Sequence, residues 1–474
     1  MIPVLALAIR QIAKLRHRAF LAGWVFGMGW FGAGISWVHV SIADFGGLPL
    51  VGSLAIMALL CGYLSLFPAL AFSLTSRFFT VNLWPLALPF FWCFSEWLRS
   101  WLLTGFPWLS LGYSQIDSPL SGWAPIIGET GLTALLLIGA SLLACNGFKR
   151  ATLYGGLISL AIYVSGWLAL QHAWVSPKQT YSVAMVQGNI PQSLRWVPEQ
   201  DQPTMDKYLH LTEPLWNSDL IIWPEAAVPK LEPLAQPYLA RVNERAFNEN
   251  TALITGIVNF NWETQEAWNN LIVLGKRTPT ATLPDYQYFH NNRFAKHHLL
   301  PVGEFVPFED WLRPLAPLFD LPMSSFARGA YQQANLEANG IHLAPAICFE
   351  IAFPRQVAAN LYANTDMIIT VSNDAWFGRS HGPAQHLEIA RMRALEFGRP
   401  VLRATNNGIS AFIDAKGQIT ARLPQFEAGS LTAPVTATEG LTPYRQLGDL
   451  PMGILLTLLL IVSITSKKHR RLFS

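Results

Sequence analysis

The sequence predicts an α-helical membrane bundle joined to a large α/β domain. The chain has 474 residues, of which 51% are hydrophobic and 13% are charged, whereas about 25% of the residues in ordinary soluble domains are charged. The shortage of charge lies at the N-terminal end, where residues 1–176 include eight Lys or Arg and four Asp or Glu. After residue 180, short apolar runs alternate with helical patterns. The first pattern is typical of membrane-spanning helices and the second of a layered α/β fold.

Apolar segments of about 20 residues have the length that crosses the core of a bilayer. We expect such spans at 19–41, 49–75, 83–103, 121–146, 152–171 and 450–466, with a shorter apolar segment at 2–12. This pattern divides the chain into three parts. They are N-terminal transmembrane helices at 1–176 (about six segments, the first one short), a soluble domain at 177–446, and a C-terminal helix with a basic tail at 447–474.

The soluble part shows strand and helix patterns in alternation. Apolar runs predict strands at 182–187, 220–223, 252–258, 270–274, 342–347, 367–371, 401–404 and 411–414. Helical periodicity predicts helices at 201–215, 232–248, 353–362 and 383–398. The sequence at 414–418, Asp-Ala-Lys-Gly-Gln, is typical of a hairpin turn, so part of the sheet is expected to be antiparallel.

Basic residues fall on alternate connections between the expected spans, at 14–18, 77, 149–150 and 467–471. The positive-inside rule places these connections in the cytoplasm. The soluble part, 177–446, then lies outside, which is the periplasm in a cell with two membranes, and the chain is a multi-pass protein of the inner membrane. Segment 2–12 would begin on the outer side. Either Met1 lies outside, or the segment only enters the interface, or a helix precedes it.

Charge and cysteine content disfavour other classes of protein. The net charge of +3 gives no reason to expect a nucleic acid partner. Three of the four cysteines, Cys61, Cys93 and Cys145, lie in apolar runs, which leaves Cys348 without an obvious disulfide partner. No Cys/His spacing of a structural metal site is present. We therefore expect neither a metal nor a cofactor.

Three residues of reactive types stand at strand ends or in loops. Cys348 ends an apolar run, Glu225 follows Trp-Pro after another run, and Lys296 lies in a loop. A thiol of ordinary pKa, about 8.5, is mostly un-ionised at neutral pH, so a nucleophilic cysteine needs a base or a cation beside it. A carboxylate can remove and return the proton, and a lysine can stabilise an oxyanion. Each residue alone also fits an ordinary structural position.

Longer motifs surround these three residues. Trp223-Pro224-Glu225, Lys296 with the block 298–307, and the block 347–350 resemble the Glu-Lys-Cys signature of the nitrilase superfamily. The blocks 372–378, 385–386, 391–396 and 403–408 extend this likeness. With several spans before this domain and one after it, the chain as a whole resembles the apolipoprotein N-acyltransferase family of the bacterial inner membrane.

The resemblance implies a fold, a reaction and two partners. The fold is a nitrilase-like αββα sandwich on a membrane bundle. The reaction takes an acyl chain from a phospholipid, usually phosphatidylethanolamine, through a cysteine thioester. The acceptor is the free α-amino group of a diacylglyceryl-modified N-terminal cysteine on an apolipoprotein, which completes lipoprotein maturation. No cofactor takes part.

The resemblance also assigns roles to single residues. Cys348 would be the nucleophile, Glu225 the general base and acid, and Lys296 the oxyanion stabiliser, together with the backbone N–H of Phe349. Supporting or substrate-binding positions in the family match Glu304, Glu350, Trp196, Asn269 and Trp376. Phe349 stands where the family commonly has tyrosine, so any role of a hydroxyl group there is in doubt.

Two questions stay open at this point. The loop after Lys296 is unusually apolar, and either forms a lid that touches lipid or covers the sheet as core; its apolar residues are Phe305, Phe308, Trp311, Leu312, Leu315, Leu318, Phe319, Leu321 and Met323. The same three reactive residues would also serve a membrane-anchored amidase that passes the acyl group to water. A non-enzymatic scaffold is a third reading.

Overall fold

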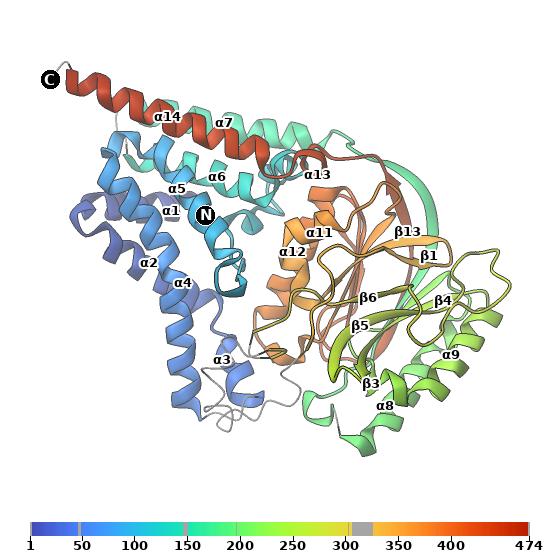
Figure 1. The fold of residues 1–474 in the computed structure, drawn as a ribbon. Coiled ribbons are helices and arrows are strands. Elements are labelled where there is room, and N and C mark those ends of the chain that lie inside the picture. The colour runs from blue at the N-terminus through green and yellow to red at the C-terminus, as the bar shows by residue number, and fades with distance from the viewer. Residues whose placement is uncertain are drawn as a thin grey trace. The chain divides into compact units, whose positions relative to one another are not determined.

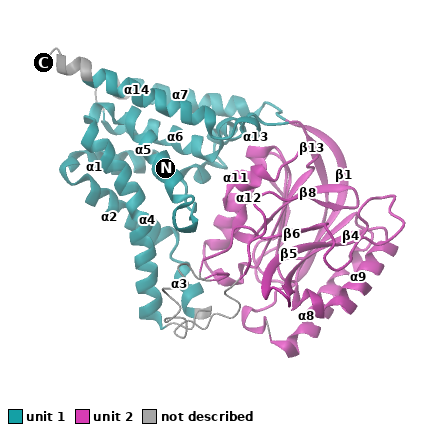
Figure 2. Cartoon of the chain, in the orientation of Figure 1, with its two compact units in different colours: residues 1–43, 48–174, 441–474 teal, residues 44–47, 175–440 magenta. Residues whose placement is uncertain are grey.

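The computed structural model describes residues 2–45, 49–145, 150–195, 197–301, 303–305 and 326–472. The chain forms two compact units (Figure 2). The helical unit comprises 1–43, 48–174 and 441–474, and the sandwich unit comprises 44–47 and 175–440. Trp196 and most of the apolar loop expected as a lid, 306–325, lie outside the described residues.

The helical unit contains four stretches that are long and apolar enough to cross a membrane by length and composition, Leu50–Phe78, Pro119–Cys145, Leu153–Leu170 and Leu450–Lys467. Their positions coincide with four of the six expected spans. The long helices are α1 (Ile2–Lys14), α2 (Ala19–Gly34), α4 (Leu50–Phe78), α5 (Trp84–Arg99), α6 (Ala124–Cys145), α7 (Arg150–Leu170) and α14 (Leu450–Leu472) (Figure 1).

The two remaining expected spans are shorter than the sequence suggested. Helices α2 and α5 have 16 residues each, which corresponds to about 24 Å at 1.5 Å per residue, less than the bilayer core of about 30 Å. After α5 the backbone turns, because Leu103, Thr104 and Gly105 all have positive φ. The apolar run expected as a span at 83–103 therefore extends beyond the end of α5 and into this turn, which hydropathy alone does not reveal.

The sandwich unit contains two sheets with the strand orders β13-β1-β2-β4-β5-β6, with β3 beside β4, and β12-β11-β10-β9-β8-β7. The strands of the first sheet are β1 (Ser176–Gln187), β2 (Leu220–Ile222), β3 (Val228–Leu231), β4 (Ala252–Asn261), β5 (Glu266–Gly275), β6 (Arg293–Ala295) and β13 (Gly429–Glu439). Those of the second are β7 (Leu336–Ala338), β8 (Ile341–Ile347), β9 (Met367–Ser372), β10 (Val401–Thr405), β11 (Ala411–Ile413) and β12 (Ile419–Arg422).

The two sheets pack face to face and helices cover their outer faces, which confirms the αββα sandwich (Figure 1). Side chains alternate along a strand, so β1 contributes to two cores. Val183 and Met185 pack against residues of the second sheet, whereas Ala184 and Val186 pack beneath the helices. The helices are α8 (Pro198–Thr212) and α9 (Gln236–Asn248) on the first sheet, with α11 (Pro354–Ala359) and α12 (Gly382–Phe397) on the second.

Most strands lie where apolar runs predicted them, and the hairpin turn at 414–418 joins antiparallel β11 and β12. The apolar runs missed strands β3, β6, β7 and β13, and indicated β12 only through the hairpin turn before it. Strand β13 is the longest of the missed strands. It has eleven residues and pairs antiparallel with β1 from Gly429 to Glu439. Its sequence is rich in threonine rather than in large apolar residues. Threonine favours strands because it is β-branched, but it does not give an apolar run.

Candidate active site

The candidate site gathers at the carboxyl ends of parallel strands. Strands β1, β2 and β4 run parallel in one sheet, and β8, β9 and β10 run parallel in the other. Glu225 follows β2, and Cys348 follows β8 directly. The backbone turns sharply at both places, since Cys348 has φ of 54° and Ala226 has φ of 47°. Non-glycine residues adopt this left-handed conformation in only a few per cent of cases, and strained positions of this kind recur at active sites.

Lys296 lies between two carboxylates. Its Nζ is 2.8 Å from Glu304 Oε2 and 3.6 Å from Glu225 Oε1. The Asn269 amide joins the same two carboxylates, because its Nδ2 donates to Glu225 Oε1 at 2.7 Å and to Glu304 Oε1 at 3.0 Å. Burial alone would lower the pKa of Lys296, yet Glu304 and Glu225 hold this pKa above its ordinary value. The lysine is therefore cationic at neutral pH.

The Cys348 thiol is un-ionised at rest. Burial, and then the Glu225 carboxylate, raise the pKa of this thiol to about 12, with Lys296 acting in the opposite direction. A thiol with this pKa carries almost no thiolate at neutral pH. Any reaction in which sulfur attacks as a nucleophile therefore needs a base that removes the proton during the attack.

Glu350 ties the backbone of the lysine loop to the backbone of the cysteine turn. Its Oε1 accepts hydrogen bonds from the N–H groups of His297 at 2.8 Å and His298 at 3.0 Å. Its Oε2 accepts from the N–H of Ile347 at 2.8 Å, and the Gln356 amide donates to Oε1 at 2.6 Å. The carboxylate is 1% exposed. Its position supports the site rather than facing a reactant.

The ring of Phe349 packs in an aromatic cluster. Its centroid lies 5.0 Å from that of Phe353 and 5.8 Å from that of His298, while His298 stacks on Phe353 at 3.5 Å. A phenylalanine at this position thus keeps the packing that a ring provides. Trp376 lies half-buried in the turn after β9, close in sequence to Asp374.

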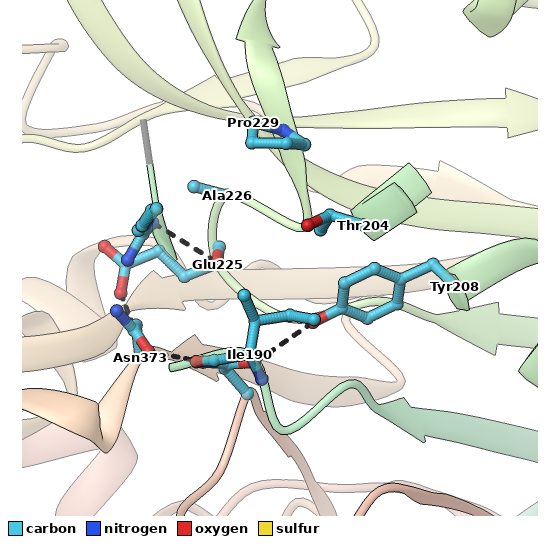
Figure 3. Close-up of a pocket in the computed structure, with 9 residues that line it drawn as sticks. Ile190, Thr204, Tyr208, Glu225, Ala226, Pro229 and Asn373 are labelled. Atoms are coloured by element: carbon cyan, nitrogen blue, oxygen red, sulfur yellow. Dashed lines mark hydrogen bonds between the residues drawn. The ribbon is translucent and has the colours of Figure 1, made fainter. Parts of the chain in front are cut away.

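A small pocket opens beside Glu225 (Figure 3). Asn373 lies next to Glu225 in this pocket, and its backbone N–H donates to Glu225 Oε2 at 3.0 Å. The Arg195 guanidinium donates to the Glu225 carbonyl oxygen at 3.5 Å. The pocket is lined by Ile190, Arg195, Thr204, Tyr208, Glu225, Ala226, Pro229, Asn373 and Asn406.

The motif blocks contained Asn373 and Asn406, and Arg195 directly precedes Trp196, but sequence reasoning gave these three residues no role. The signal that could have found them is their position within motif blocks, since Arg195 precedes Trp196 and Asn373 follows β9 directly. Among the described residues, no group of three or more His, Cys, Asp or Glu side chains could hold a metal ion.

Both parts of the chain match known protein families. Residues 1–142 match the model of the apolipoprotein N-acyltransferase N-terminal domain, and residues 182–444 match the model of the carbon-nitrogen hydrolases. The apolipoprotein N-acyltransferase of Vibrio cholerae is 49% identical over 454 residues, which cover 95% of this chain and 88% of that protein. The chain belongs to the apolipoprotein N-acyltransferase family.

Two further proteins extend this comparison. The apolipoprotein N-acyltransferase of Shewanella oneidensis is 47% identical over 477 residues, covering 98% of this chain and 91% of that protein. A solved CN-hydrolase superfamily protein from Xanthomonas campestris is similar to 54% of this chain and 91% of its own, at a TM-score of 0.39 and 20% identity. Membership of the apolipoprotein N-acyltransferase family confirms the resemblance inferred from the motifs.

Proposed function

We propose that this chain transfers an acyl chain from a phospholipid to the α-amino group of a diacylglyceryl-modified N-terminal cysteine of an apolipoprotein. The observation that carries the chemical part of this proposal is a partly buried, un-ionised thiol with a positioned carboxylate and a buried cationic lysine beside it. The names of the relatives supply the acceptor class. Phosphatidylethanolamine is the expected donor.

In the first half-reaction, Glu225 takes the proton from the Cys348 thiol as sulfur attacks the ester carbonyl carbon. The oxyanion that forms lies beside the ammonium group of Lys296 and the backbone N–H of Phe349. Its collapse breaks the ester C–O bond and leaves a thioester on sulfur. Glu225 then returns the proton to the lysophospholipid alkoxide. A carboxylate can act first as a base toward the sulfur and then as an acid toward the alkoxide oxygen, since it holds the proton between the two steps.

In the second half-reaction, the amine of the apolipoprotein attacks the thioester carbonyl. Glu225 accepts a proton from the amine, an amide bond forms, the C–S bond breaks, and the proton returns to sulfur. Glu304 accepts a hydrogen bond from Lys296, and Asn269 donates hydrogen bonds to both Glu225 and Glu304. These contacts position the base and the lysine for both half-reactions. The scheme consists of acyl and proton transfers and calls for no metal or cofactor.

The proposed location is the inner membrane, with the catalytic domain, 177–446, on the periplasmic side. Helices that can span a membrane lie on both sides of this domain in the sequence, at Leu153–Leu170 and Leu450–Lys467. Basic residues stand at their other ends, at 149–150 and 467–471. The positive-inside rule would place those ends in the cytoplasm. An acyl donor and acceptor that both reside in the bilayer fit a nucleophile held at the membrane.

The proposal is tested by mass spectrometry of the full chain in membranes that contain a phospholipid with an isotope-labelled acyl chain. A labelled adduct is expected on the peptide that contains Cys348, and hydroxylamine should remove it because it cleaves thioesters. The proposal fails if no adduct forms while apolipoproteins still become N-acylated in cells that lack this chain.

Gly256 offers a separate test of the position of Glu225. A Cβ atom at Gly256 on β4 would lie 2.4 Å from Ala226 N and 2.7 Å from Glu225 Cα. We expect Gly256→Ala to displace the Glu225 turn and to lower the rate of acyl transfer by about 10²-fold, a loss that a shift of about 1 Å in a catalytic group can cause.

The matched control is Gly429→Ala in β13 of the same sheet, where the nearest atom to the added Cβ lies 3.8 Å away. This variant should keep the wild-type rate. Equal rates for the two variants would show that β4 does not fix Glu225. Initial rates are measured with a labelled phospholipid and a diacylglyceryl peptide in detergent micelles.

A further inference from the structure

A second set of polar residues lies behind Cys348 and has no part in the mechanism above. It consists of Ser372 at the end of β9, Asp374 just after it, His386 on α12 and Arg403 on β10. Each is at most 2% exposed. Most buried polar groups in proteins are hydrogen-bonded, so the arrangement of this set is informative.

Asp374 is the centre of this set. Its Oδ2 accepts a hydrogen bond from Arg403 Nη2 at 2.7 Å. Its Oδ1 accepts from the Ser372 hydroxyl at 2.6 Å and lies 3.2 Å from His386 Nδ1. Although burial opposes ionisation, Arg403 and His386 hold the pKa of the Asp374 carboxyl well below its ordinary value. Asp374 is therefore a carboxylate, and it can only accept hydrogen bonds.

Ser372 lies between this carboxylate and the nucleophile. Its Oγ is 2.6 Å from Asp374 Oδ1 and 3.4 Å from Cys348 Sγ. A hydroxyl has one proton and two lone pairs. The short contact to an ionised carboxylate is the stronger hydrogen bond, so the serine proton points to Asp374. The lone pairs then face sulfur, and the contact with Cys348 is a hydrogen bond donated by the thiol.

His386 connects Asp374 to the backbone of the nucleophile. Its Nε2 lies 3.1 Å from the carbonyl oxygen of Cys348, and its Nδ1 lies 3.2 Å from Asp374 Oδ1. Cys348 is also the residue with the left-handed φ of 54°. Asp374 thus contacts both Ser372, which touches the sulfur of Cys348, and His386, which touches its carbonyl oxygen.

We propose that Ser372 Oγ accepts a hydrogen bond from the thiol of resting Cys348. Asp374 is the positioning residue, because it accepts the hydrogen bond of the serine hydroxyl and so leaves the oxygen lone pairs directed at sulfur. This inference rests on the proposed function for the role of Cys348. An acceptor stabilises the protonated form of sulfur. The pair therefore keeps the nucleophile neutral, and so slow to react with oxidants, until Glu225 removes the proton in the presence of an acyl donor.

Other charged groups also act on this thiol. They are Glu225 after β2, Lys296 after β6, Asp374 after β9 and Arg195 before α8. A substitution at Ser372 leaves all of these charges in place. It therefore isolates the effect of one hydroxyl group on the proton of the thiol.

The experiment measures the alkylation rate of Cys348 by iodoacetamide as a function of pH, with the full chain in detergent and peptide mass spectrometry as the readout. Ser372→Ala should alkylate about fivefold to tenfold faster at neutral pH, with its profile displaced to lower pH, because one hydrogen bond to the protonated thiol is lost. Ser372→Thr retains a hydroxyl and should keep the wild-type profile.

The matched control is Thr370→Val on the same strand. Thr370 is 0% exposed, and its hydroxyl has no hydrogen-bond partner within the described part of the chain. This variant should titrate as wild type. Unchanged or slower alkylation of Ser372→Ala would overturn the proposal, as would equally faster alkylation of the Ala and Thr variants. No acyl donor is present, so this result is independent of whether Cys348 forms a thioester.

Discussion

Replacement of Cys348 by serine should lower the rate of acyl transfer by roughly 10⁴- to 10⁶-fold, the usual loss when the nucleophile of a covalent mechanism is removed. A serine hydroxyl holds its proton far more tightly than a thiol does. The site already raises the pKa of the thiol to about 12 through burial and the Glu225 carboxylate, and the same environment would oppose ionisation of a hydroxyl. The rate is measured with a labelled phospholipid and a synthetic diacylglyceryl peptide.

The control for this substitution is Cys145→Ser, at the end of α6 in the helical unit. This cysteine is also free, and its replacement should leave the rate unchanged. A Cys348→Ser variant that retains more than a tenth of the wild-type rate would contradict a mechanism through sulfur. The thermal unfolding midpoint of both variants shows whether the chain remains folded.

Replacement of Glu225 by glutamine should lower the rates of both half-reactions by about 10²- to 10⁴-fold, the usual contribution of a general acid–base group. Glutamine keeps an oxygen that can accept the hydrogen bond from the Asn373 N–H, which is 3.0 Å long in the wild type. It cannot accept the thiol proton or return one to the leaving group. Thioester formation and transfer to the amine are measured separately, in single-turnover experiments.

The matched control is Glu249→Gln. Glu249 pairs with Arg245 at the end of α9, and both side chains are more than a third exposed, so this pair contributes little to stability. Wild-type thioester formation by Glu225→Gln would assign the base to another group. A loss confined to the second half-reaction would show that Glu225 acts only on the amine.

Sequence alone predicted most of the sandwich. Buried parallel strands are apolar on both faces, so β2, β4, β9 and β10 stand out as apolar runs. Other features were not visible in this way. The threonine-rich β13 depends on pairing with β1 rather than on burial of large side chains, and the apolar run that contains α5 continues past the end of the helix at Arg99 into a turn at Leu103.

The candidate site was predictable to a similar extent. Glu225, Lys296, Cys348, Glu304 and Asn269 were named from motifs. Hydrogen bonds and ion pairs join four of them, and the charges of Glu225 and Lys296 act on the Cys348 thiol. The roles of Ser372 and Asp374 were not assigned. Their roles depend on the direction of each hydrogen bond. They also depend on the register in which β9 pairs with β10. Neither property can be read from residue types along a chain.

The fate of the acyl group on Cys348 tests the central claim most directly. The acyl-enzyme is formed with labelled phospholipid, freed of donor, and divided between buffer alone and buffer with a diacylglyceryl-cysteinyl peptide. We expect the label to leave Cys348 rapidly for the α-amino group of the peptide, and to remain on the protein in buffer alone. Release of labelled fatty acid at the same rate in both samples would contradict this account, because the chain would then be a hydrolase that passes the acyl group to water.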